Sequence, residues 1–219
     1  MSSETINKLN SIQDNIDKLL NPSQKKPKII CVSKTFSIDR LLPLINYGHI
    51  HFGENKVQEA EFKWKSFLEK NKQIKLHMVG KLQSNKAKKA VKLFHYIHSL
   101  DNQKLADTLS KFEQDFNKRL YYFIQVNVGM ENQKSGILPA QIKEFYNYCT
   151  KKLNLNVIGL MAIPPNDGKE EKHFKLLYES NISLGLKDLS IGMSGDYKKA
   201  LNFNATFLRI GTAIFGKRI

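Results

Sequence analysis

Short apolar runs alternate with longer segments of helical periodicity along most of this chain, and this alternation constrains the fold most. Eight runs rich in β-branched or aromatic residues are separated by stretches in which apolar residues recur every three or four positions. Parallel strands joined by helices give this pattern. Eight such units in a chain of 219 residues leave room only for short loops. The sequence therefore predicts an α/β fold, a (β/α)8 barrel of the TIM type.

The expected strands are 28–33, 49–52, 75–79, 96–100, 121–128, 156–163, 188–193 and 206–210. Seven helical stretches are expected between them. In residues 103–116, for example, Leu105, Leu109 and Phe112 share one side, as they do in a helix that covers a sheet.

An additional helix is predicted before the first strand. Ile6, Leu9 and Ile16 recur at roughly helical spacing, and prolines follow. Sustained heptads are missing, so we expect this helix to lie against the barrel rather than to form a dimeric coiled coil. Residues 1–27 are then the helix and its lead-in. With no linker or internal repeat, residues 1–219 are expected to form a single domain.

The chain is strongly basic, with 35 Lys and Arg against 20 Asp and Glu, a formal charge of +15. Such a charge suggests nucleic acid or an anionic membrane as a partner. Only four of the basic residues are arginines, which nucleic-acid readers favour, and the lysines are dispersed. We therefore expect no nucleic-acid function. A basic barrel that binds nucleic acid or an acidic protein is kept as an alternative.

Two cysteines, Cys31 and Cys149, form neither a disulfide framework nor a metal-binding pattern. The N-terminus lacks the charge and apolar stretch of a signal peptide, and no run approaches the ~18 apolar residues of a membrane span. We expect a soluble, cytoplasmic protein that does not contact membranes.

Lys34 is the first candidate functional residue, because it ends an almost wholly apolar run, Ile29-Ile30-Cys31-Val32-Ser33. Barrel proteins build their sites at the carboxyl ends of the strands. Desolvation there lowers the pKa of a lysine and makes its amine a nucleophile toward aldehydes. The alternative is a solvated lysine at a strand end, one of 31 in the chain.

Glycine and hydroxyl side chains follow the last two strands. Gly192-Met193-Ser194-Gly195-Asp196 follows the seventh, and Arg209-Ile210-Gly211-Thr212 spans the end of the eighth. Phosphate sites of (β/α)8 barrels usually form in these two loops, where glycine lets an anion approach the backbone and hydroxyl groups donate hydrogen bonds. Ser194 and Thr212 suit this role. Two ordinary turns with hydroxyl caps remain the alternative.

Several motifs, taken together and in order, resemble the pyridoxal phosphate homeostasis proteins, whose fold is similar to the N-terminal barrel of alanine racemase. The resemblance covers nearly the whole chain. Its motifs are Val32-Ser33-Lys34-Thr35, Phe52-Gly53-Glu54-Asn55, His77-Met78-Val79-Gly80, Leu82-Gln83-Ser84-Asn85-Lys86, Lys134-Ser135-Gly136, Gly159-Leu160-Met161-Ala162-Ile163-Pro164, Gly192-Met193-Ser194 and Arg209-Ile210-Gly211-Thr212. Lys56 departs from the family pattern without touching the proposed anchor or phosphate loops.

The resemblance implies pyridoxal 5'-phosphate (PLP) as cofactor and assigns roles residue by residue. Lys34 matches the family's Schiff-base lysine. Ser194, Gly211 and Thr212 match its phosphate contacts. Arg209 corresponds to the arginine that faces the pyridine nitrogen in the related racemase barrel.

The resemblance also implies a carrier or regulator of the cofactor rather than an enzyme. PLP is a good electron sink when its ring nitrogen is protonated and paired with a carboxylate. An arginine only donates hydrogen bonds, so it cannot accept one from a protonated ring nitrogen. The chain ends at Ile219, without the additional domain from which related racemases take a catalytic tyrosine. We expect a monomer that holds PLP, exchanges it with small amines or amino acids and passes it to recipient apo-enzymes. A PLP-dependent racemase-like enzyme is the alternative.

Other polar residues near strand ends have open roles. We include Asn55 as a contact to the ring hydroxyl or a bound amine, although it could equally cap the next helix, as could Glu54, Asn85 and Asn127. We also include Met161 as a residue that packs on the cofactor ring, with core filling as the equal alternative.

The histidines give no metal site on sequence grounds. His49 and His51 alternate onto one side of a strand, but a third ligand at suitable spacing is missing. For His77 we favour a hydrogen bond in the core over a place in the pocket. Glu131 and Lys134 are expected to form a surface ion pair.

Overall fold

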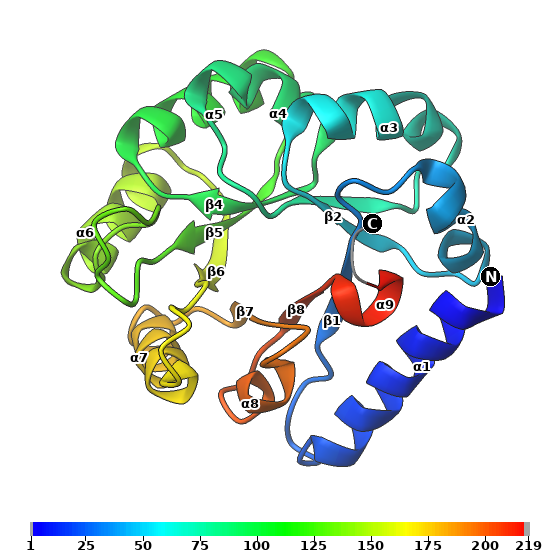
Figure 1. The fold of residues 1–219 in the computed structure, drawn as a ribbon. Coiled ribbons are helices and arrows are strands. Elements are labelled where there is room, and N and C mark those ends of the chain that lie inside the picture. The colour runs from blue at the N-terminus through cyan, green and yellow to red at the C-terminus, as the bar shows by residue number, and fades with distance from the viewer. Residues whose placement is uncertain (1, 217–219) are drawn as a thin grey trace.

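A computed structural model of the chain, which describes residues 2–216, confirms the predicted barrel. Eight parallel strands pair in sequence order, and β8 pairs with β1 to close the ring. The strands are β1 (Lys28–Val32), β2 (His51–Glu54), β3 (Lys75–Met78), β4 (Tyr96–Leu100), β5 (Tyr121–Gln125), β6 (Val157–Met161), β7 (Asp188–Met193) and β8 (Phe207–Ile210). Helices surround this ring (Figure 1).

At least one helix follows every strand in the described part of the chain. The main helices are α2 (Ile38–Asn46), α3 (Val57–Lys70), α4 (Ala87–Leu93), α5 (Gln103–Asp115), α6 (Ile142–Asn147), α7 (Glu170–Ser183), α8 (Tyr197–Leu201) and α9 (Thr212–Phe215). Short 3-10 turns precede α4 and α6, and a π-helical turn follows α6. In α5, Leu105 and Leu109 are fully buried, as their spacing predicts. The seven helical stretches expected between strands are therefore confirmed.

The additional N-terminal helix is α1 (Ser2–Leu19). Its apolar side chains Leu9, Ile12 and Ile16 are buried. The helix packs against α2, α8 and α9, and Figure 1 shows it along the outside of the barrel. The prediction that it lies against the barrel is confirmed.

The second strand is shifted from its predicted position. It was expected at 49–52 but spans His51–Glu54. The backbone N–H of His49 donates to the carbonyl of Leu44, so this residue still belongs to the turn after α2. At the other end Glu54 stays in register with β3, because its buried carboxylate has hydrogen-bond partners.

The fifth strand ends three residues earlier than predicted, at Gln125. The N–H of Val126 still donates to the carbonyl of Met161 on β6, but Val126 also forms a bridge with Ile137, and the N–H of Asn127 donates to the carbonyl of Ile137 instead of to the sheet. This long-range pairing turns the chain away, and alternation of apolar residues does not reveal it. The remaining strand ends lie within two residues of the predicted ones.

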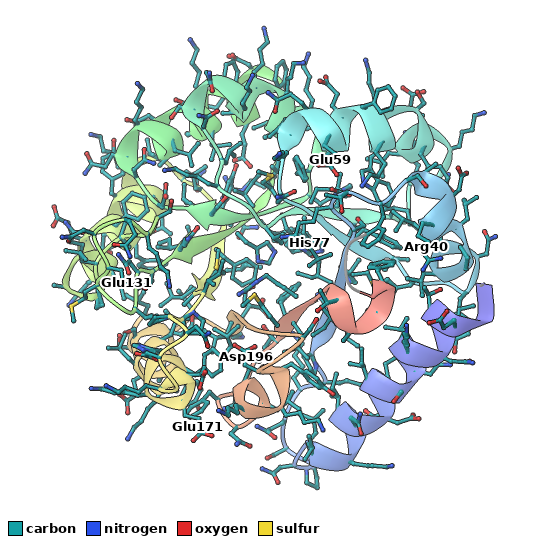
Figure 2. The ribbon with its side chains drawn as sticks, viewed as in Figure 1. Arg40, Glu59, His77, Glu131, Glu171 and Asp196 are labelled. Carbon is teal, nitrogen blue, oxygen red and sulfur yellow. The ribbon has the colours of Figure 1, made fainter. Side chains whose placement is uncertain are left out.

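The barrel interior is unusual for this fold, since aromatic rings and histidines occupy places where branched aliphatic residues dominate elsewhere. The interior apolar cluster is Ile30, Tyr96, Phe123, Met161 and Phe207. His77 stacks on Tyr96 with 4.2 Å between ring centroids, and His98 stacks on Phe123 at 4.4 Å. Figure 2 shows His77 near the centre of the ring of strands. Buried ring nitrogens need hydrogen-bond partners.

Within residues 2–216, none of the helices combines the length and the apolar character that crossing a bilayer requires. Cys31 and Cys149 are both buried and not joined in a disulfide. Burial raises the pKa of the Cys149 thiol to about 12, so the thiol stays protonated and unreactive.

Candidate cofactor site

A sizeable cavity lies at each end of the barrel. The larger, about 750 Å³, is beside the amino ends of β3 to β5, and lysines such as Lys72, Lys92 and Lys118 line it. The smaller, about 480 Å³, lies at the carboxyl ends of the strands. Sites in this fold form at the carboxyl ends, and the convergent polar groups described below lie there, so we take the smaller cavity as the candidate site.

The smaller cavity brings together six of the seven residues expected to contact the cofactor. They come from loops after the first, second, seventh and eighth strands and from the end of the eighth: Lys34, Asn55, Ser194, Arg209, Gly211 and Thr212. The first and last of these positions are far apart in sequence and meet because β1 pairs with β8.

Met161, the seventh expected residue, is not among the residues that line this cavity. It is the last residue of β6, is fully buried and packs in the interior cluster with Ile30 and Phe123. This position favours the core-filling alternative that the sequence left open.

A strained turn holds the half-buried Lys34. The next residue, Thr35, has a φ of +71°, a left-handed conformation that a β-branched residue rarely adopts. Its backbone N–H donates to the carboxylate of Glu59 on α3 (labelled in Figure 2), which stabilises the turn. The backbone direction at Lys34 is therefore fixed from both sides, by β1 before it and by this contact after it.

The buried carboxylate of Glu54 also stabilises this turn, through the residue before Lys34. Oε1 of Glu54 accepts hydrogen bonds from Ser33 Oγ at 2.7 Å, Lys63 Nζ at 2.8 Å and Trp64 Nε1 at 2.9 Å. The Lys63 ammonium also donates to the carbonyl of Ser33 at 2.8 Å. Glu54 is fully buried and does not line the cavity, so its role is to join β1, β2 and α3. Sequence reasoning missed Lys63 and Trp64, because they lie on a helix.

Asn55 lies on the cavity wall opposite a glycine. A Cβ atom at Gly80 would lie 2.4 Å from the carbonyl oxygen of Asn55, so only glycine allows this close approach. Oδ1 of Asn55 is buried and has no hydrogen-bond partner among the described residues. A buried acceptor of this kind suits a donor group on a ligand.

The hydroxyl of Ser194 joins the two glycine-containing loops. Its Oγ accepts hydrogen bonds from the backbone N–H groups of Gly211, at 3.3 Å, and Ala213, at 3.2 Å. The Thr212 side chain is exposed beside them at the cavity edge. The two loops thus present hydroxyl groups and backbone N–H groups together, which is the chemistry that binds phosphate.

The loop after β7 is held tightly in this position. The carboxylate of Asp196, labelled in Figure 2, accepts a hydrogen bond from the backbone N–H of Met193 at 2.5 Å. Gly192 has a φ of +88°, and a Cβ atom there would lie 2.8 Å from the Cβ of Ala200. Glycine is required at this point to bring the loop over α8.

Arg209 places a fixed cation in the cavity wall, although its side chain is almost wholly buried. Nη1 donates to the carbonyl and the hydroxyl of Ser190 at 2.6 and 2.7 Å, and Nη2 donates to the carbonyl of Ala162 at 2.8 Å. Burial lowers the pKa of the guanidinium to about 10, and the charge of Asp196 opposes this shift, so Arg209 is positively charged at neutral pH.

His77 forms hydrogen bonds through both ring nitrogens, which confirms the predicted core role. Its Nε2 lies 2.9 Å from His51 Nδ1, and its Nδ1 lies 2.9 Å from His98 Nε2. Nδ1 of His98 in turn lies 2.9 Å from Ser190 Oγ. Desolvation lowers the pKa values of His77 and His98 well below the ordinary range, so both rings are neutral. Sequence reasoning missed His98 and Ser190; the signal was one histidine in each of three successive strands.

His49 and His51 do not form a joint metal site. Nε2 of His49 contacts the carbonyl of His51, whereas the ring of His51 contacts His77. In the described part of the chain, no group of three or more His, Cys, Asp or Glu side chains is placed to hold a metal ion.

Asn127 and Asn85, two further candidates, lie outside the residues that line the cavity. The side chain of Asn127 bonds to the backbone of Glu131 in both directions, so it closes the loop after β5. Asn85 belongs to the 3-10 turn Ser84–Lys86. The predicted ion pair between Glu131 and Lys134 is confirmed at 2.6 Å.

Comparison with known proteins shows the family to which the chain belongs. The model of the family "Alanine racemase, N-terminal domain" matches residues 8–218. The pyridoxal phosphate homeostasis protein of Vibrio cholerae is 36% identical over 230 residues, covering 96% of this chain and 98% of that protein. The chain belongs to the pyridoxal phosphate homeostasis protein family. Another relative of the same name, from Pasteurella multocida, is 34% identical over 223 residues, covering 96% of both chains.

Solved structures show the same barrel in a family member and in a more distant enzyme. PipY of Synechococcus elongatus, solved with PLP bound, superposes with a TM-score of 0.83 at 30% identity, over 97% of this chain and all of PipY. Alanine racemase of Clostridium difficile superposes with a TM-score of 0.73 at 14% identity, over 99% of this chain and 57% of the racemase. The second likeness concerns the fold alone.

Proposed function

We propose that this homeostasis family member binds PLP in the carboxyl-end cavity, holds it through Lys34 as a Schiff base, and acts in intracellular PLP homeostasis as a carrier or regulator. The observation that carries this proposal is the meeting of Lys34 with the Ser194 and Thr212 loops in one cavity of about 480 Å³.

The residues in the cavity fit each functional group of PLP. The amine of Lys34 suits the aldehyde, and the hydroxyl and N–H groups around Ser194 and Thr212 suit the phosphate. Arg209 suits the ring nitrogen as a donor, and the unpartnered Oδ1 of Asn55 suits the ring hydroxyl. When bound, PLP would supply the aldehyde to which the amine of Lys34 could attach as a Schiff base with loss of water.

The cavity favours a carrier over a catalyst. PLP supplies an electron sink for carbanions, and this works best when a carboxylate partner keeps the ring nitrogen protonated. Arg209 donates only and cannot play that part. Among the described lining residues, Lys34 and Arg209 are the ionisable ones. Proton transfer on both faces of a substrate carbon therefore lacks a second acid or base.

The proposed ligands follow from this arrangement. Besides PLP, small amines or amino acids can exchange with Lys34 for the aldehyde, and apo-enzymes that need PLP are the proposed recipients. The proposed setting is the cytoplasm and the proposed state a monomer. A racemase-like activity is the alternative.

Reconstitution of the purified protein with PLP tests the proposal. We expect a visible absorption band that borohydride abolishes, with a reduced adduct located on Lys34 by peptide mass spectrometry. Lys34→Ala should remain colourless. Lys28→Ala, at the opposite end of the same strand, should behave like the unaltered protein. A colourless protein, or an adduct on a different lysine, would exclude the proposal.

A further inference from the structure

A continuous chain of hydrogen bonds leads from Arg209 through the barrel interior to His51. Its members are Arg209, Ser190, His98, His77 and His51, contributed by β8, β7, β4, β3 and β2. The successive distances are 2.7, 2.9, 2.9 and 2.9 Å. Ser190, His98 and His77 are fully buried, and His51 is half-buried at the amino end of β2.

The chemistry of these five side chains fixes the donor-to-acceptor direction of every hydrogen bond in the series. A guanidinium can only donate, so Ser190 Oγ accepts from Arg209. Among the described residues, the other hydrogen-bond partner of Ser190 Oγ is His98 Nδ1. The buried hydroxyl proton must therefore point to His98 Nδ1. In the reverse direction Ser190 would accept twice, and its own proton would be left without an acceptor in a dry site.

The same direction continues through the histidines. A neutral imidazole has one donor and one acceptor nitrogen. Because Nδ1 of His98 accepts, its Nε2 carries the proton and donates to His77 Nδ1. Nε2 of His77 then donates to His51 Nδ1, and His51 keeps its proton on Nε2. All three rings take the same tautomer.

This series of hydrogen bonds positions the Arg209 guanidinium without neutralising its charge. No carboxylate lies within ion-pair distance of Arg209 in the described structure; its protein acceptors are the neutral oxygens of Ser190 and Ala162. Donation onward to His98 makes Ser190 Oγ a stronger acceptor, because hydrogen bonds in series polarise one another. Ser190 and Ala162 accept hydrogen bonds from three of the five guanidinium N–H groups. The other two can donate to a ligand in the cavity.

We propose that Ser190, His98, His77 and His51 are positioning residues, which hold Arg209 as an unneutralised donor toward an acceptor nitrogen of the bound heteroaromatic ring. This inference rests on the proposed function for the identity of that ring. The direction of the hydrogen bonds does not depend on the proposed function, since it is a property of the protein alone.

Ser190→Ala tests the chain where it meets Arg209. Ser99→Ala is the matched control, because Ser99 is a buried serine on β4 whose hydroxyl has no partner among the described residues. We expect Ser190→Ala to raise the dissociation constant for PLP by roughly tenfold, the effect of losing one hydrogen bond to a charged group. It should also shift the visible band and its pH midpoint. Ser99→Ala should leave all three unchanged.

His77→Phe cuts the chain in its middle and provides the second variant should Ser190→Ala not fold. Phenylalanine preserves the stacking on Tyr96 but removes both ring nitrogens. We expect a smaller shift of the band in the same direction. If the variant that folds has the affinity and spectrum of Ser99→Ala, the positioning role is wrong.

The cofactor-free protein supplies an independent readout. Long-range ¹H–¹⁵N correlation spectra of the histidine rings should show His51, His77 and His98 protonated at Nε2, and Ser190→Ala should perturb His98 first. A proton on Nδ1 of His98 would overturn the chain's direction. Failure of the unaltered protein to bind PLP would count against the proposed function alone, because these spectra need no cofactor.

Discussion

The carboxylate of Glu54 accepts a hydrogen bond from the hydroxyl of Ser33 at 2.7 Å, which ties the end of β2 to the residue before Lys34. The same oxygen accepts from the ammonium of Lys63, whose side chain is only 7% exposed. A buried ion pair adds little net stability, but removal of one partner leaves the other charge unpaired. The main contribution of Glu54 to stability is therefore to offset the charge of the buried Lys63 ammonium.

Glu54→Gln should destabilise the protein by about 2 kcal/mol, because it removes the nearer carboxylate of the buried Lys63 ammonium and leaves Glu59, at 3.8 Å, as its ion-pair partner among the described residues. Chemical denaturation measures this change. Glu61→Gln is the control, since Glu61 on the same helix as Lys63 pairs with Lys89 in an exposed bridge worth less than about 1 kcal/mol. Equal losses in the two variants would show that Glu54 is not a structural brace.

Thr35→Gly should separate stability from cofactor retention. Glycine adopts the positive φ of this position without strain, which offsets the greater entropy of the unfolded glycine, so we expect the free energy of unfolding to change by less than about 1 kcal/mol. The turn after Lys34 becomes looser, and PLP should dissociate faster. Stopped-flow transfer of PLP to an apo-enzyme measures the rate; an unchanged rate would contradict a role for the strained turn.

Ser194→Ala and Thr212→Ala should each weaken PLP binding about three- to tenfold, because each removes a hydroxyl from the phosphate loops. Ser194→Ala should have the larger effect, because it also removes the hydrogen bonds by which Oγ joins its own loop to the N–H groups of Gly211 and Ala213. Equilibrium dialysis gives the affinities. Thr108→Ala, on the exposed surface of α5, is the control, and affinities equal to its own would place the phosphate elsewhere.

Stability should fall as the pH decreases from 7 to 5.5. Burial lowers the pKa of His51 and of His95 to about 4 and the pKa values of His77 and His98 still more clearly. The unfolded chain then binds more protons than the folded one below the ordinary histidine pKa, so acid favours unfolding. Each histidine contributes about 1 kcal/mol over this window. Urea titrations at several pH values test the slope, and His95→Gln should reduce it.

A single amino-acid enantiomer distinguishes carrier from racemase. After incubation of L-alanine with the PLP-loaded protein, chiral chromatography should detect no D-alanine above the level seen with Lys34→Ala. This follows from the lack of a second ionisable group beside Lys34 and Arg209 among the described lining residues. Sustained turnover that Lys34→Ala abolishes would establish the enzyme instead.

The fold could be predicted because alternation of strands and helices is a local property of the sequence, and closure of eight such units follows from their number. Strand ends depended on partners elsewhere in the chain. β5 stops where Val126 bridges to Ile137, and β2 extends to Glu54, where Ser33, Lys63 and Trp64 all donate to one oxygen of that carboxylate. Neither partnership has a signature in the strand itself.

The site could be predicted where residues follow strand ends in recognisable motifs, as Lys34, Ser194 and Thr212 do. Met161 shows the limit, since a strand-end methionine can face the cavity or the interior and here lies in the interior cluster. The hydrogen bonds among His51, His77 and His98 show a second limit of prediction from the sequence. Each ring satisfies its neighbour from a different strand, so no single segment of sequence contains the pattern.

The pairing of β1 with β8 has a consequence for the timing of cofactor capture during synthesis. Lys34 leaves the ribosome well before Arg209, Gly211 and Thr212. On the proposed function, a chain synthesised only as far as β7 therefore carries Lys34 without the second of the two proposed phosphate loops, so PLP would be retained only after the barrel has closed. A ligand that binds the closed ring alone also stabilises that closure by mass action. On this proposal, bound PLP would hold the first and last strands of the barrel together.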